Sequence, residues 1–114
     1  MTIISLIPNK TDALAEFQIN VLQWAKDRGI IPNATPESQT LKAVSEVGEL
    51  ADAVLKRDRL ATVDAIGDVL VCLINVAALT GISLEECTSA AWEQIKDRKG
   101  YLLPNGVFVK EEQK

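Results

Sequence analysis

Two pairs of acidic residues stand at helical spacing in the middle of this chain, and they are the residues best suited to chemistry. Glu46 and Glu49 are three positions apart, and Asp64 and Asp68 are four positions apart. Residues at these spacings lie one turn apart on the same face of a helix, so each pair presents two carboxylates to one ligand. Carboxylate oxygens are the ligands that Mg²⁺ and Mn²⁺ prefer, so the pattern predicts a divalent cation site.

The first pair falls in a predicted helix over residues 36–57, where Thr35 is a suitable N-cap and Pro36 suits the first helical position. Lys42, Glu46, Glu49 and Ala53 share one face of this helix. An isolated Glu-x-x-Glu can equally be part of an ordinary solvated face. The opposite side is a broad apolar arc, formed by Leu41, Val44, Val47, Gly48, Leu50, Ala51, Val54 and Leu55.

The second pair falls in a predicted helix over residues 60–80 that is apolar nearly all round, as expected of a buried central helix. Asp64, Asp68 and Asn75 lie within about 40° of one line along it. Carboxylates that face an interior are costly unless they are paired, which favours a cation shared with Glu46 and Glu49. Alternatively, Asp64 favours the positive end of its helix and Asn75 satisfies a hydrogen bond in the core.

Two further helices and a turn complete the expected elements. The first helix runs from an N-cap at Thr11 to about Arg28, and a loop covers residues 30–36. The last helix begins with a capping box at residues 83–86 and ends near Gly100. Residues 101–114 contain Pro104-Asn105-Gly106, which suggests a turn or a short hairpin. The sequence therefore predicts an all-α, four-helix bundle-like fold.

Length and composition set limits on the kind of protein. A chain of 114 residues has room for a single domain over residues 1–114. It contains no histidine, so any catalysis must use carboxylates, Lys, Arg, Tyr or metal-bound water. Cys72 and Cys87 lack zinc-site spacing, and we expect both to be buried reduced thiols.

Charge and hydropathy exclude two classes of partner. A net charge of −4 without a basic run argues against binding of a nucleic-acid polymer. The residues Met1–Pro8 lack the pattern of a signal peptide, and the apolar run Val69–Leu79 is interrupted by Asn75 and is too short to span a bilayer. We expect a cytoplasmic protein that does not bind a membrane.

The segment Glu46-Val47-Gly48-Glu49-Leu50, followed by Asp64-Ala65-Ile66-Gly67-Asp68-Val69-Leu70, resembles the signature of the MazG-like all-α nucleotide pyrophosphohydrolases. That signature is Glu-Glu-x-x-Glu and then Glu-x-x-Asp. The resemblance extends from Trp24 through Lys42 to the basic segment at residues 95–101. Ser45 stands where the family commonly has the first Glu of its doublet, and Ala65 stands where the Glu of Glu-x-x-Asp is expected, a place that Asp64 could fill.

The resemblance implies Mg²⁺- or Mn²⁺-dependent hydrolysis of a nucleoside triphosphate, favouring a deoxynucleotide (dNTP), between the α- and β-phosphates. The metal ligands would be Glu46, Glu49, Asp64 and Asp68, with Glu46 also a candidate base for the attacking water. Trp24 would stack on the base or belong to the core, and Asn75 would orient the ligand or contact the sugar edge. Basic residues would hold the pyrophosphate or remain solvated surface charges: Lys42, Arg98 and Lys99.

Short helices with so much apolar surface predict a homodimer or homotetramer, as in the family. Two alternatives to the nucleotide pyrophosphohydrolase are open. Phosphoribosyl-ATP pyrophosphohydrolases share the helical architecture and the acidic pattern. A catalytically silent helical dimer that serves as an interaction module would explain Ser45 and Ala65. The preferred base, the number of metal ions and the biological purpose of the reaction are not fixed by the sequence.

Overall fold

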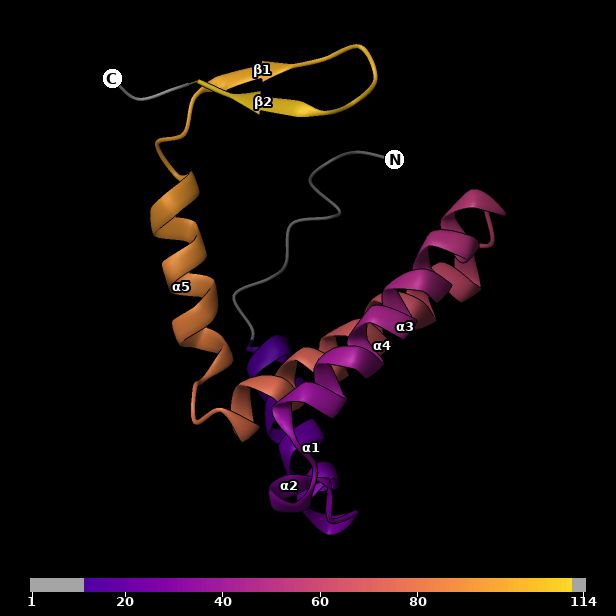
Figure 1. Ribbon diagram of the computed structural model, residues 1–114, viewed down its shortest axis with the longest axis vertical. Coiled ribbons are helices and arrows are strands. Elements are labelled where there is room, and N and C mark those ends of the chain that lie inside the picture. The colour runs from indigo at the N-terminus through magenta and orange to yellow at the C-terminus, as the bar shows by residue number, and fades with distance from the viewer. Residues whose placement is uncertain (1–11, 112–114) are drawn as a thin grey trace. The chain divides into compact units, whose positions relative to one another are not determined.

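The computed structural model describes residues 12–111, and over these residues it has five helices and one antiparallel two-stranded sheet (Figure 1). The chain divides between Ile82 and Ser83 into two compact units, and each unit is described by itself. The predominantly helical fold expected from the sequence is confirmed. The elements are α1 (Ala13–Asp27), α2 (Ile30–Asn33), α3 (Pro36–Leu55), α4 (Arg59–Leu79), α5 (Leu84–Ile95), β1 (Gly100–Leu102) and β2 (Phe108–Lys110).

The first unit is built on α3 and α4, which lie side by side as an antiparallel pair (Figure 1). The Thr35 side chain caps α3 by accepting a hydrogen bond from Ser38 N at 3.1 Å, and Pro36 occupies the first turn as predicted. Asp58 Oδ1 caps α4 by accepting from Ala61 N at 3.0 Å. These caps satisfy amides that the helix leaves free at its start. The predicted limits of both helices are confirmed to within two residues.

The face of α3 that carries the acids is the face that packs against α4. Among the described elements α3 makes its contacts with α4, and its buried residues are Ala43, Glu46 and Ala53. A solvated surface face is therefore the wrong interpretation for Glu46. The apolar arc is instead largely open in the single chain, with Leu41 71%, Val44 64% and Leu55 81% exposed.

The prediction that α4 is buried nearly all round is wrong for the single chain. Its buried residues are Ala65, Cys72, Ile74, Asn75 and Ala77, whereas several large apolar side chains remain exposed, namely Leu60, Val63, Ile66 and Leu73. The reason is that α1, α2 and α3 together cover only part of its circumference.

By length and composition alone α4 could cross a membrane, because it has 21 residues and contains an 18-residue stretch with a mean hydropathy of 1.9. The run Val69–Leu79, predicted to be too short to span a bilayer, is only part of this helix. Asp64 and Asp68 lie within this helix and count against a membrane span, since ionised carboxylates are costly in a bilayer.

The remaining helices of the first unit are α1 and α2. The buried side chains of α1 are Val21 and Ala25, and α1 packs on α4. The predicted N-cap Thr11 lies outside the described residues, and the position before α1 is Asp12. The predicted loop over residues 30–36 contains the short helix α2, which Ala34 N closes by donating to Ile30 O at 2.8 Å.

The second unit consists of α5 and the β1–β2 hairpin. Ser83 caps α5 by accepting from Glu86 N at 3.1 Å, which is one of the two hydrogen bonds of the predicted capping box. The helix ends at Ile95, before the expected limit near Gly100. The predicted hairpin is confirmed, with Gly100 opposite Lys110. A Cβ at Gly100 would collide with the carbonyl oxygen of Val109, so this strand start requires glycine.

The cysteine prediction is confirmed for Cys72, which is buried, and wrong for Cys87, which is exposed. Both are free thiols. Cys87 lies on α5, where none of the residues is buried. The prediction followed from the general tendency of free cysteines to be buried, and the second unit by itself does not bury this side chain.

Candidate metal centre

Three carboxylates converge where α3 packs against α4. Glu46, Glu49 and Asp68 each offer an oxygen, and the three oxygens lie within 4.8 Å of one another. Within residues 12–111 this is the group of acidic side chains that could hold a metal ion, and we call it the carboxylate cluster. Two of its members come from successive turns of α3 and one from α4, so the packing of the two helices assembles the cluster.

Glu46 is the most deeply placed member of the cluster, with only 7% of its surface exposed. Its Oε1 lies 3.2 Å from Lys42 Nζ, one turn earlier on α3. Its buried Oε2 receives a hydrogen bond from none of the described residues. A buried carboxylate oxygen without a partner is costly, so this oxygen is suited to a cation or a proton donor.

The electrostatics of the cluster are those of crowded like charges. The pKa of Glu49 is raised, first by a hydrogen bond with Glu46 that a shared proton makes possible, and then by the charge of Glu46. The pKa of Asp68 is raised first by burial and then by the charges of Asp64 and Glu46. The charge of Glu46 thus makes Glu49 and Asp68 harder to ionise, a penalty that a divalent cation would remove.

The donor set of the cluster fits a hard divalent ion. It consists of carboxylate oxygens that come from two helices, and one oxygen of Glu46 is buried without a partner among the described residues. Mg²⁺ and Mn²⁺ prefer such oxygen ligands.

Asp64, the fourth predicted metal ligand, is not one of the three converging carboxylates. It is exposed on α4, one turn before Asp68, and its charge reaches Asp68 because it contributes to the raised pKa of that carboxyl. Ala65, at the position where the resemblance expects a glutamate, is buried with 5% exposure. The structure therefore places three acids together and a fourth beside them.

The other predicted substrate residues of the first unit are Lys42, Trp24 and Asn75. Lys42 reaches the cluster through its ion pair with Glu46, which raises the pKa of the lysine. Trp24 on α1 is 44% exposed, so the core does not enclose it. Asn75 is 1% exposed, and its Oδ1 has no donor among the described residues, so the expected hydrogen bond in the core is not formed by that oxygen.

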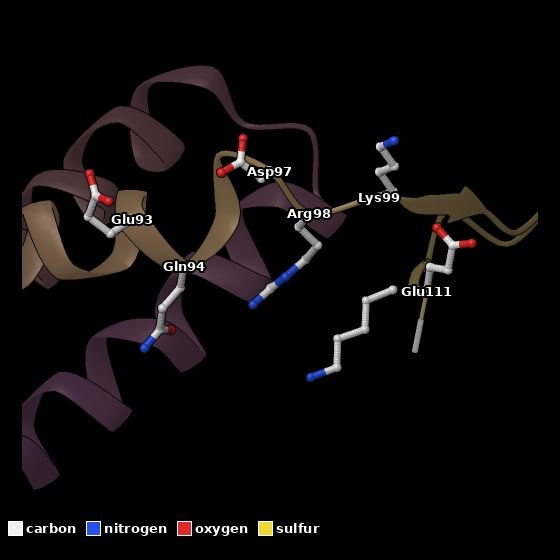
Figure 2. Close-up of a pocket in the computed structure, with 7 residues that line it drawn as sticks. Glu93, Gln94, Asp97, Arg98, Lys99 and Glu111 are labelled. Atoms are coloured by element: carbon white, nitrogen blue, oxygen red, sulfur yellow. The ribbon is translucent and has the colours of Figure 1, made fainter. Parts of the chain in front are cut away.

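Arg98 and Lys99 belong to the second unit, where they line a concave region of about 730 Å³ (Figure 2). Lys110 adds a third positive charge to this region, and three acids line it as well, namely Glu93, Asp97 and Glu111. Positive and negative charges are therefore balanced around the concavity.

Cys72 was predicted only to be a buried thiol, but it is also a neighbour of the carboxylate cluster. It lies one turn after Asp68 on the same face of α4. Burial raises the pKa of this thiol, and the charge of Glu46 raises it further. The i+4 spacing from Asp68 was the signal that could have placed Cys72 beside the carboxylates.

Comparison with known proteins identifies the family. The family model described as the MazG nucleotide pyrophosphohydrolase domain matches residues 34–102, which include the whole of α3 and α4. An uncharacterized 18.2 kDa protein in the rep-hol intergenic region of Haemophilus phage HP1 is 38% identical over 58 residues. That match covers 51% of this chain but only 36% of the phage protein.

Among solved structures, the fold is similar to that of the cyanophage S-2L MazG-like pyrophosphohydrolase, with a TM-score of 0.67 and 24% identity over 90% of this chain and 96% of that one. The S-2L structure was determined with dGDP and three catalytic Mn²⁺ ions per active site. At this identity the similarity shows a shared fold. With the match of the family model over α3 and α4, it follows that the chain belongs to the MazG nucleotide pyrophosphohydrolase domain family.

Proposed function

We propose that this protein hydrolyses a deoxynucleoside triphosphate between its α- and β-phosphates, releasing the monophosphate and pyrophosphate, and that the reaction depends on Mg²⁺ or Mn²⁺. The observation that carries this proposal is the convergence of Glu46, Glu49 and Asp68, together with the buried, unpartnered Oε2 of Glu46. The family supports a nucleotide substrate. The dGDP and the Mn²⁺ ions of the S-2L relative support a deoxynucleotide and a divalent ion.

In this proposal Glu46, Glu49 and Asp68 hold the metal, and Asp64 supplies negative charge beside them. A divalent ion bound there would neutralise phosphate charge and make an attacking water more acidic. The chain contains no histidine, and in this proposal a carboxylate takes the proton of that water. We assign this role to Glu46, because its Oε2 accepts no hydrogen bond from the described residues.

The residues around the cluster have supporting roles in the proposal. Lys42 is one turn from Glu46 and largely exposed, which suits contact with a phosphate oxygen. Trp24 is exposed enough to stack on a base, and we place Asn75 toward the sugar edge. Arg98 and Lys99 are proposed to hold the pyrophosphate, as the resemblance implies, although acids balance their charge within the second unit.

We further propose that the protein is a homodimer, or a tetramer built from dimers. The apolar arc of α3 is exposed in the single chain, including Leu41, Val44 and Leu55. Apolar side chains of α4 are exposed as well, including Leu60 and Val63. A second copy of the chain would cover such a surface, since large exposed apolar patches commonly mark interfaces.

The experiment that tests the function measures pyrophosphate and monophosphate released from the common NTPs and dNTPs with Mg²⁺ or Mn²⁺. We expect the native protein to release both products, and Glu49→Gln and Asp68→Asn each to lower the rate by about 100-fold or more, as loss of a metal ligand does. Asp52→Asn is the matched control, because Asp52 is an exposed acid of α3 outside the cluster.

If no nucleotide is cleaved by a folded native protein, the proposed function is wrong. Ser45 and buried Ala65 would then mark a site that has lost activity, and the protein would be an interaction module.

A further inference from the structure

The carboxylate cluster already has a cation of its own, because Lys42 Nζ lies 3.2 Å from Glu46 Oε1. The two ends of this ion pair are in different environments. The Glu46 side chain is 9% exposed, whereas the Lys42 side chain is 60% exposed. The lysine therefore reaches from solvent into the cluster and can leave it again without unpacking the core.

Helix stability alone does not account for this pair. In an isolated helix an acid placed four residues before a lysine is the more favourable order, and Lys42–Glu46 has the opposite order. The same helix contains a pair in the favourable order, Asp52 and Lys56, at 3.6 Å with both side chains more than 70% exposed. The two pairs differ in what surrounds the acid. Glu46 is crowded by Glu49 and Asp68, whereas Asp52 is not part of the cluster.

A divalent ion and the Lys42 ammonium would compete for the same carboxylate. Both are positive, and binding of one next to Glu46 weakens the attraction of the other through Coulomb repulsion. Lys42 pairs with Oε1 of Glu46, whereas Oε2 of the same carboxylate has no hydrogen-bond partner among the described residues. A divalent ion that binds Glu46, Glu49 and Asp68 together has a stronger electrostatic attraction to the cluster than the ammonium, which pairs with Glu46 alone.

We propose that Lys42 is a transferable counter-ion: its ammonium neutralises Glu46 until a divalent cation binds the cluster, and it then moves to the phosphate chain of the nucleotide. Lys42 is thus a substrate-binding residue that couples metal binding to nucleotide binding. The long exposed stem of the lysine allows this movement. This inference rests on the proposed function, because it assumes a phosphate-bearing substrate at the cluster.

The test is calorimetric titration of Mn²⁺ into the full chain, with and without the non-hydrolysable α,β-imido analogue of dGTP. Lys42→Met removes the charge and keeps an apolar stem, and Lys42→Arg keeps the charge. Lys56→Met is the matched control, because it breaks an i,i+4 ion pair on the same helix outside the cluster. Circular dichroism of every variant verifies the helical fold.

We expect Lys42→Met to bind Mn²⁺ alone about threefold to tenfold more tightly than the native protein, since about 1.4 kcal/mol corresponds to tenfold. Lys42→Arg and Lys56→Met should bind it as the native protein does. The analogue should raise the Mn²⁺ affinity of the native protein by a larger factor than that of Lys42→Met, because the native lysine gains a phosphate partner when it leaves Glu46.

An unchanged Mn²⁺ affinity in Lys42→Met overturns the inference while leaving the proposed function intact. A second outcome also overturns the inference: Lys42→Met binds Mn²⁺ more tightly, but the analogue raises the Mn²⁺ affinity of this variant by the same factor as that of the native protein. Lys42 would then be a fixed charge that repels the ion and does not move to the nucleotide. If the native protein binds no Mn²⁺, both the inference and the proposed function fail.

Discussion

Glu46 on α3 and Asp68 on α4 approach each other until their carboxylate oxygens lie within 4.8 Å. The charge of Glu46 is one of the causes of the raised pKa of Asp68, after burial and the charge of Asp64. Two ionised carboxylates at this separation repel each other, and this repulsion opposes the packing of α3 against α4. A proton or a cation relieves this repulsion, and both effects can be measured.

The repulsion predicts a pH dependence of stability. The pKa values of Glu49 and Asp68 are raised in the folded protein. At a pH between the ordinary pKa of such a carboxyl and its raised pKa, the folded chain therefore binds more protons than the unfolded chain. The stabilisation from these protons is complete below the ordinary values, near pH 4, and is lost as the pH rises through the raised ones.

To isolate this effect, we would compare urea unfolding of the native protein and of a Glu49→Gln/Asp68→Asn variant from about pH 4 to about pH 7 without metal. The variant should gain stability relative to the native protein as the pH rises. A difference between the two proteins that is constant with pH would contradict the assignment of these shifts to the cluster.

Divalent cations are expected to stabilise the fold through the same residues. An ion that binds only the folded protein contributes about 2.7 kcal/mol at a concentration 100 times its dissociation constant. Mg²⁺ or Mn²⁺ should therefore raise the thermal unfolding midpoint of the native protein and of Asp52→Asn, and chelation should reverse the rise. Glu49→Gln and Asp68→Asn should show little response, and an equal response in all four proteins would place the ion elsewhere.

Asp64 is expected to assist the cluster without binding the ion directly. It lies outside the three converging carboxylates, and its charge reaches Asp68. Asp64→Asn should weaken Mn²⁺ binding by about threefold to tenfold, because the attraction between an exposed carboxylate and a nearby ion is partly screened by solvent. It should also lower the pKa of Asp68, which NMR titration of that carboxyl would show. If Asp64→Asn weakens Mn²⁺ binding as severely as Asp68→Asn, Asp64 is a direct ligand.

The proposed homodimer predicts a specific effect of charge on the apolar arc. Val44 is 64% exposed in the single chain. Val44→Glu should convert an oligomer to a monomer in size-exclusion chromatography with light scattering, because burying a carboxylate in an apolar interface costs several kcal/mol. Leu102→Glu is the control, since Leu102 is 68% exposed but lies in the hairpin. A monomeric native protein would contradict the proposal.

Local signals in the sequence predicted most of the fold. Thr35 and Pro36 gave the start of α3, and Ser83 gave that of α5. The turn residues before Val107 predicted the hairpin. These features depend on a few neighbouring residues, whose side chains cap or turn the backbone. The short helix α2 was missed because Pro32 suggested a loop, and Ile31 before it is indeed non-helical.

The packing of α3 could not be predicted in the same way. A helical wheel separates the apolar arc from the acidic face, but it does not say which face meets a helix of the same chain. Small residues decide this here, because Ala43 and Ala53 flank Glu46 on the face that packs on α4. The convergence of Glu46, Glu49 and Asp68 was inferred from the polar stripe on α4, whereas Asp64 lies on that stripe outside the cluster.

Ala43 and Ala65 have a consequence for the choice of ion. Both are at most 7% exposed, one turn from Glu46 on α3 and one turn from Asp68 on α4, respectively. Ala43 lies on the face of α3 that packs on α4, and both side chains are small, so we expect these two positions to influence how closely the helices pack and how far apart the acidic oxygens lie. Mg²⁺ binds oxygen at about 2.0–2.1 Å and Ca²⁺ at about 2.3–2.6 Å. We therefore expect residues that are not ligands to contribute to discrimination between these two ions. A valine at either alanine should shift the ratio of the Mg²⁺ and Ca²⁺ dissociation constants, measured by calorimetric titration, toward the larger ion.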